Sequence, residues 1–224
     1  MRKEQSYASL YPNVVTGPDT ILRCKLWAGP TSPGKVFDYS LNGNLGTLNG
    51  TDIAPVYPGF SFNGTDDYIA LTNDVGRGFA AFSVSAWVKR TANGIIIASS
   101  SGGSINWWFK MGGDRAIFGL NIVAEGVKTA SSTDRPSANI WHHVMGVYDG
   151  VNVKVYVNGV VTVGDATTGV ITSNAYVTWI GARSSAGPQE RFTGSLDDII
   201  AFNTAKSAQQ VRSIYESTRW RYGV

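Results

Sequence analysis

The clearest hydrophobic pattern in the chain is an alternation between residues 151 and 157. Valine stands at every second position, with asparagine, lysine and tyrosine between. Because side chains alternate across a strand, this pattern predicts a strand with one buried and one solvated face. Asp149-Gly150 and Asn158-Gly159 flank it, and both dipeptides suit two-residue hairpin turns, which need positive φ. The stretch from Trp141 to Val163 therefore predicts three consecutive antiparallel strands.

Short apolar segments separated by turn residues continue along the chain, without a helical period between them. A series of this kind is typical of an antiparallel sandwich or barrel. Further strands are expected at 21–27, 60–71, 82–89, 94–99, 105–111, 116–123, 127–129, 177–182 and 196–202.

One helix is predicted near the C-terminus. Ser207 and Gln210 form a capping-box pattern ahead of Val211, Ile214 and Tyr215, which recur at helical spacing. The expected organisation is an N-terminal arm (1–20), one β-sandwich with a short C-terminal helix (21–216) and a C-terminal tail (217–224).

Composition narrows the class of protein. The chain of 224 residues is 43% hydrophobic and 16% charged, which indicates a globular domain. The net charge of +3 is too small to indicate a nucleic-acid partner, and the single Cys24 excludes an intrachain disulfide. Residues 1–20 hold no apolar run of signal-peptide length, and no membrane span is expected. We expect a chain made in the cytoplasm, which as a virion component would still act outside the cell.

Five motifs occur in the order found in one known family. They are D-Y-S-L-N-G-N-L-G-T-L (38–48), F-N-G-T-D-D-Y-I-A-L (62–71), F-S-V-S-A-W-V-K (82–89), W-H-H-V (141–144) and the closing G-S-L-D-D-I-I-A-F-N-T-A-K-S-A-Q-Q-V (194–211). Together they resemble laminin G-like domains of the concanavalin A-like lectin/glucanase superfamily, especially its pentraxin-related branch. The resemblance covers residues 21 to 216. It implies an all-β fold of two antiparallel sheets packed as a jelly roll, with function on a concave face or rim.

The chain departs from the pentraxin-like pattern in two places. It reads Gly103-Ser104-Ile105-Asn106 where those relatives carry an Asp-Asn pair. It also reads Ala182-Arg183-Ser184-Ser185 where they carry an acidic cluster. The double calcium site of that branch is therefore expected to be absent.

No catalytic residues are predicted. Retaining glycanases need two carboxylates about 5 Å apart, whereas the four glutamates of this chain are widely separated. The doublets Asp66-Asp67 and Asp197-Asp198 would point to opposite faces of a regular strand. His142 and His143 would also diverge, with no cysteine or third histidine to complete a metal site.

A single structural calcium ion is one hypothesis for the loop Asp38 to Gly46. Asp38, Asn42 and Asn44 offer oxygen ligands. The resemblance to glucanase-like relatives adds Asp197 or Asp198 of the last strand. The alternative is that these residues only make turns, as Asx side chains do.

Trp107 and Trp108 are the strongest indication of ligand binding. Neighbours on a strand face opposite ways, so one is expected in the core and the other outside, with Asn106 and Lys110 on the parity of Trp108. Glycan contact, a protein interface and core packing are the alternatives for this pair. In the tail, Arg219, Trp220, Arg221 and Tyr222 are candidates for docking on another chain, or for folding back.

These observations predict a non-catalytic binding or structural module. The preferred hypothesis is a component of a larger assembly, such as a phage virion decoration or tail protein. Its protein partners would then be copies of itself or capsid and tail proteins. The alternatives are a lectin-like carbohydrate-binding module and, third, a glycan-cleaving enzyme.

Overall fold

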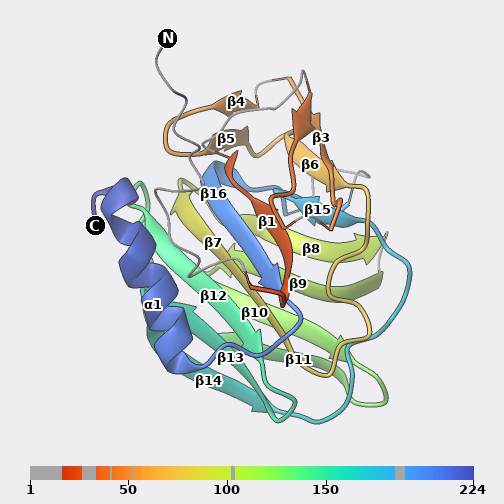
Figure 1. Cartoon of the computed structure of the whole chain (residues 1–224). Helices are drawn as coiled ribbons and strands as arrows, with labels where there is room; N and C mark the ends of the chain where they lie inside the picture. The colour runs from red at the N-terminus through yellow and green to blue at the C-terminus, as the bar shows by residue number, and fades with distance from the viewer. Residues whose placement is uncertain (1–16, 27–33, 41, 52, 102–103, 185–189) are drawn as a thin grey trace.

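The computed structural model describes residues 17–26, 34–40, 42–51, 53–101, 104–184 and 190–224. Two antiparallel sheets pack face to face, and one α-helix lies on the outside of one of them (Figure 1). The all-β sandwich with a C-terminal helix is confirmed. Within the described residues, no helix is both long and apolar enough to cross a membrane.

The first sheet, which we call the helix-covered sheet, has the order β14-β13-β12-β7-β16-β5-β4, and β1 also pairs with β16. Its strands are β1 (Thr20–Cys24), β4 (Ala54–Pro55), β5 (Phe60–Asn63), β7 (Phe82–Arg90), β12 (His142–Tyr148), β13 (Asn152–Val157), β14 (Val160–Ala166) and β16 (Thr193–Phe202).

The second sheet, the open sheet, has the order β11-β10-β9-β8-β15-β6-β3-β2. Its strands are β2 (Lys35–Val36), β3 (Gly46–Asn49), β6 (Tyr68–Leu71), β8 (Gly94–Ser101), β9 (Ser104–Gly112), β10 (Arg115–Ile122), β11 (Gly126–Ser131) and β15 (Thr178–Ile180).

The predicted three-stranded meander is β12, β13 and β14. Asn158 and Gly159 both have positive φ at the second turn, 49° and 82°, as predicted for this dipeptide. The first turn is longer than predicted and includes Val151, which is exposed and not part of the buried face. The Asp149 side chain accepts hydrogen bonds from the backbone N–H of Val151 and Asn152. Val151 therefore belongs to an Asx turn, and the strand β13 begins one residue later, at Asn152.

The two sheets approach closely where β12 of one faces β10 of the other. Phe118 on β10 projects toward Gly146 on β12, where an added Cβ would lie 2.3 Å from the phenyl ring. Phe118 and its neighbours Phe82 and Phe109 are fully buried. A side chain at position 146 would therefore force the sheets apart, which explains the glycine in the middle of a buried strand.

The helix α1 (Ala208–Thr218) begins with the predicted capping box. The Ser207 hydroxyl accepts from the backbone N–H of Gln210, whose side-chain oxygen accepts from the backbone N–H of Ser207. Val211 and Ile214 pack on the outer face of the helix-covered sheet, in one apolar cluster with Met145 and other buried side chains. Both faces of β7 and β12 are therefore buried (Figure 1).

Candidate functional site

A hollow of about 480 Å³ opens on the outer face of the open sheet. Trp108 of β9 lines the hollow over the sheet, which we call its floor; we call the segment with Asn174 and Tyr176 its wall, and the three charged residues Lys110, Arg183 and Glu190 its rim. The hollow combines an aromatic side chain with amides and charged groups. Its full lining is Ser104, Ile105, Trp108, Lys110, Ile117, Asn121, Val127, Asn174, Tyr176, Arg183 and Glu190.

The Trp108 ring lies across the neighbouring strand β10. Trp108 pairs directly with Gly119, and a Cβ on that glycine would lie 2.2 Å from the indole ring. The missing side chain lets the ring rest on the backbone of the sheet, half-buried and with a part of it open to the hollow. Trp108 therefore provides a supported aromatic surface, as the sequence predicted for one member of the tryptophan pair.

Two predicted ligand-binding residues, Trp107 and Asn106, prove to be buried. A β-bulge separates the pairs Ser99 with Trp107 and Ser100 with Ile105, so Asn106 is the extra residue. The bulge places Asn106 on the same inner side as Trp107, and both are 0% exposed. The assignment of Asn106 to the solvent-facing parity of Trp108 is therefore wrong, because the strict alternation is broken at Asn106. Trp107 is the member of the tryptophan pair that lies in the core, so it does not contact a ligand in the hollow.

Asn106 instead stabilises the segment that forms the wall of the hollow. Its side-chain nitrogen donates to the Asn174 carbonyl at 2.8 Å, and its oxygen accepts from the Thr172 hydroxyl at 2.9 Å. Nearby, the Asp74 carboxylate accepts from the backbone N–H of Tyr176 at 3.2 Å. Burial raises the pKa of Asp74 above its usual value. These buried groups fix the segment that carries Asn174 and Tyr176.

The rim of the hollow is an ion-pair triad. Glu190 lies between Lys110, at 2.6 Å, and Arg183, at 3.6 Å. Lys110 was predicted to belong to the site, but Arg183 and Glu190 were not. They lie about 80 residues further along the chain, and no local pattern connects them with β9.

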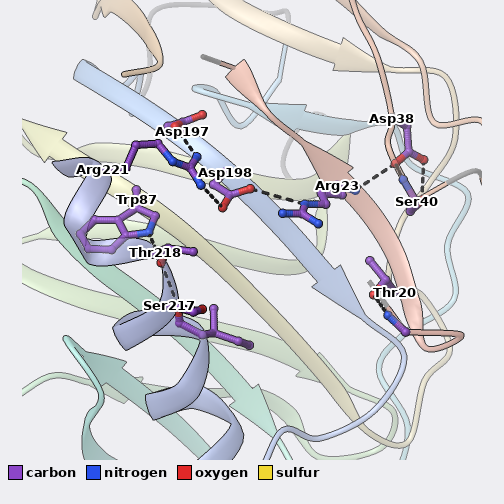
Figure 2. Close-up of polar contacts among 12 residues, drawn as sticks. Thr20, Arg23, Asp38, Ser40, Trp87, Asp197, Asp198, Ser217, Thr218 and Arg221 are labelled. Atoms are coloured by element: carbon purple, nitrogen blue, oxygen red, sulfur yellow. Dashed lines mark hydrogen bonds and ion pairs between the residues drawn. The ribbon is translucent and has the colours of Figure 1, made fainter. Parts of the chain in front are cut away.

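The doublet Asp197-Asp198 does not behave as the sequence predicted. A β-bulge in β16 separates the pairs Asp197 with Trp87 and Ile200 with Ser85, and Asp198 has a positive φ of 42°. Both carboxylates therefore reach Arg221, at 3.6 Å and 3.7 Å, instead of pointing to opposite faces (Figure 2). Burial, followed by the charge of Asp198, raises the pKa of Asp197. This pair is enclosed and lies outside the hollow.

The C-terminal residues fold back on the sandwich. A 3₁₀-turn, η3 (Arg219–Tyr222), follows α1 directly. Tyr222 stacks on Trp87 with ring centroids 3.9 Å apart, and its hydroxyl donates to Asp197 at 2.6 Å. The docking prediction is therefore wrong for Arg221 and Tyr222, and the boundary at 217 divides a continuous packed unit. Arg219 and Trp220 are exposed, Trp220 to 58%.

In the loop at Asp38, both oxygens of the carboxylate accept hydrogen bonds from the protein. They accept from the backbone N–H of Arg23, Ser40 and Asn44, as well as from the Ser40 hydroxyl and the Asn44 amide. The Arg23 side chain lies between this loop and β16 and contacts Asp198 at 3.6 Å (Figure 2). A guanidinium thus stands beside Asp198 where the hypothesis placed a cation shared with the loop.

The other two predicted loop ligands have further roles. Asn42 donates to the Thr20 carbonyl, and Asn44 donates to the Ile21 carbonyl. In the described part of the chain, no three His, Cys, Asp or Glu side chains are grouped so that they could hold a metal ion. Calcium binding stays a prediction from the sequence, and the donors around Asp38 favour the alternative of Asx turns.

The two histidines have separate environments. His143 is buried beneath α1, with its ring 5.4 Å from Trp87, and burial lowers its pKa to about 3. His142 is half-buried, and its Nδ1 lies 3.2 Å from the Asn158 amide nitrogen. Neither histidine lines the hollow.

The two antiparallel sheets and the C-terminal helix define the class of fold as a jelly-roll β-sandwich. The chain belongs to the concanavalin A-like lectin/glucanases superfamily, whose laminin G-like family model matches residues 63–212. A comparison with curated protein sequences gave no match.

Among solved structures, the receptor-binding domain of botulinum neurotoxin C/D mosaic serotype is similar, with a TM-score of 0.68 and 17% identity. The match covers 88% of this chain and 51% of that one. The binding domain of botulinum neurotoxin DC, in complex with SialylT, is also similar, with a TM-score of 0.65 and 15% identity. This match covers 89% of this chain and 52% of that one. This chain thus spans about half the length of these two structures.

Domain 4 of AbnA, a GH43 extracellular arabinanase from Geobacillus stearothermophilus, is similar over nearly its whole length. This structure, in complex with arabinotriose, has a TM-score of 0.64 and 18% identity, with 88% of this chain and 98% of that one covered. At these identities the likeness concerns the fold.

Proposed function

We propose that this chain is a non-catalytic carbohydrate-binding module and that the hollow around Trp108 is its binding site. The observation that carries the proposal is the Trp108 ring, which rests on Gly119 at the floor of an open hollow with amide groups on its wall. A flat aromatic surface beside hydrogen-bonding amides suits a sugar ring, which has apolar faces and a hydroxylated edge. Similar folds in complex with SialylT and with arabinotriose support this proposal.

Replacing Trp108 with alanine is expected to weaken glycan binding by about 2 kcal/mol, or about 30-fold in Kd, because it removes the central aromatic contact. Binding is measured by titration calorimetry with ligands found on a glycan array. Trp220→Ala is the matched control, since Trp220 is exposed in η3, which packs on the helix-covered sheet, and does not line the hollow, so its loss should leave binding unchanged. An array signal that Trp108→Ala leaves intact would contradict the assignment of the site.

The second candidate is a component of a larger assembly, such as a phage virion decoration or tail protein. Its support is a group of exposed aliphatic side chains on β14, namely Val160, Val161 and Val163, together with the exposed Trp220. Apolar side chains grouped on a surface are characteristic of protein interfaces. Light scattering that finds a stable monomer at high concentration would count against this candidate.

A glycan-cleaving enzyme is the third candidate and has the least support. The hollow has one carboxylate, Glu190, and its partners are the cations Lys110 and Arg183. The paired carboxylates Asp197 and Asp198 are buried under the C-terminal turn. A two-carboxylate mechanism needs both groups beside the substrate, and this arrangement separates them from the open hollow.

A further inference from the structure

We propose that the ligand of the hollow is an anionic glycan, whose carboxylate binds between Lys110 and Arg183 at the position that Glu190 now occupies. This inference rests on the proposed function and specifies its class of ligand. Its starting point is the charge of the lining. Two cations, Lys110 and Arg183, stand against one carboxylate, Glu190, and leave one positive charge in the hollow.

The ion pairs at the rim are exchangeable. The side chains of Lys110, Arg183 and Glu190 are 26%, 32% and 36% exposed. Ion pairs in contact with solvent contribute little to stability, because water screens them and both side chains lose freedom in forming them. A carboxylate of the ligand can therefore replace Glu190, or share its cations, at little energetic cost. Arginine suits this role because its planar guanidinium binds a carboxylate with two parallel hydrogen bonds.

The backbone fixes Glu190 at the rim. Its φ of 59° lies in the left-handed region, which is uncommon for a residue other than glycine. The carbonyl of Glu190 accepts from the backbone N–H of Ile95 at 2.8 Å. At the adjacent Gly94, a Cβ would lie 2.3 Å from the Arg191 carbonyl oxygen, so the segment is pressed against β8. Glu190 is thus held where its carboxylate meets both cations.

Trp108 and Lys110 are placed to act on one ligand. They are two residues apart on β9 and share its outer face, beyond the bulge at Asn106. Side chains at this spacing stand about 7 Å apart along a strand. A sugar ring stacked on Trp108 therefore brings a carboxylate substituent within reach of the Lys110 ammonium group.

The test compares carboxylated glycans with neutral counterparts on the full chain by titration calorimetry. The probes are sialyllactose against lactose, and oligogalacturonate against its methyl ester. We expect the carboxylated member of a pair to bind about tenfold more tightly, because hydrogen bonds to a charged group are stronger than those between neutral groups. This preference should decrease as sodium chloride is added.

Three variants test the residues. Lys110→Met and Arg183→Gln should each reduce the preference for the carboxylated glycan, whereas Glu190→Gln should strengthen its binding several-fold by removing the competing carboxylate. Arg212→Gln is the control, because Arg212 is an exposed cation on α1, outside the hollow. Thermal melts establish that each variant is folded.

The outcomes separate this inference from the proposed function. If both members of a pair bind equally and Trp108→Ala abolishes both, the module binds glycans but the anionic ligand is wrong. If Glu190→Gln weakens the carboxylated glycan, Glu190 is a ligand contact and not its competitor, which also overturns the inference. If no glycan on the panel or on an array binds, the proposed function itself fails.

Discussion

Replacing Arg221 with methionine is expected to destabilise the folded chain by about 3 kcal/mol, because removing one partner of a buried ion pair leaves an uncompensated charge. The Arg221 side chain is 6% exposed, and it faces two carboxylates, Asp197 and Asp198, that are 0% and 2% exposed. Asp198 keeps its contact with Arg23, and Asp197 keeps its hydrogen bond from Tyr222. Because these contacts remain, we expect a loss of stability at the lower end of the range for buried ion pairs. The free energy of unfolding of wild type and variant is measured by urea denaturation.

Arg219→Met is the matched control for this prediction. Arg219 is two residues away in the same 3₁₀-turn, but it pairs with the exposed Glu216, and both side chains are nearly half exposed. Its loss should leave the urea unfolding midpoint nearly unchanged, because exposed ion pairs contribute little to stability. Equal unfolding midpoints for the two variants would show that the buried network does not stabilise the C-terminal turn.

The stability of the chain should fall below about pH 6.5 because of His143. Burial lowers the pKa of His143 in the folded state to about 3, against an ordinary value of 6.5. The unfolded chain therefore takes up a proton that the folded chain cannot. This contribution to stability is complete above pH 6.5 and is lost as the pH falls toward 3, at about 1.4 kcal/mol per pH unit.

The variant His143→Phe separates this effect from the titration of the carboxylates. It keeps a ring against Trp87 and Tyr215 but removes the titrating group. The difference in unfolding free energy between wild type and variant should shift by about 2.3 kcal/mol between pH 6.5 and pH 4.5 in favour of the variant. Parallel pH profiles would mean that His143 takes up its proton in the folded chain.

The sequence predicted the strands well because the relevant signals are local. Val153, Val155 and Val157 line one face of β13, and the Asn158-Gly159 turn follows it as expected. The capping box at Ser207 also opens the helix at the predicted residue. Each of these features depends on residues within a few positions of one another, so alternation and capping chemistry were enough.

The candidate site was predicted only in part. Trp108 and Lys110 lie in the hollow, whereas Trp107 and Asn106 do not. Trp107 is buried because it faces the opposite way to Trp108 on β9, whereas Asn106 is buried because it is the extra residue of a bulge, which interrupts the alternation. A second bulge, in β16, likewise brings Asp197 and Asp198 to the same arginine. The pairing partner of a strand decides where such a bulge falls, and the strand's own sequence does not show it.

By itself, the sequence determined the antiparallel sandwich, the C-terminal helix and the presence of a tryptophan able to face outward. Only the tertiary structure decided which tryptophan faces outward, that Glu190 meets both Arg183 and, 80 positions away, Lys110, and that Tyr222 is packed on Trp87. The physical reason is the distance along the chain between the residues that determine each feature. Alternation, turns and caps follow from neighbouring residues, whereas bulge positions and contacts between distant segments are fixed by the packing of the two sheets and of the C-terminal turn.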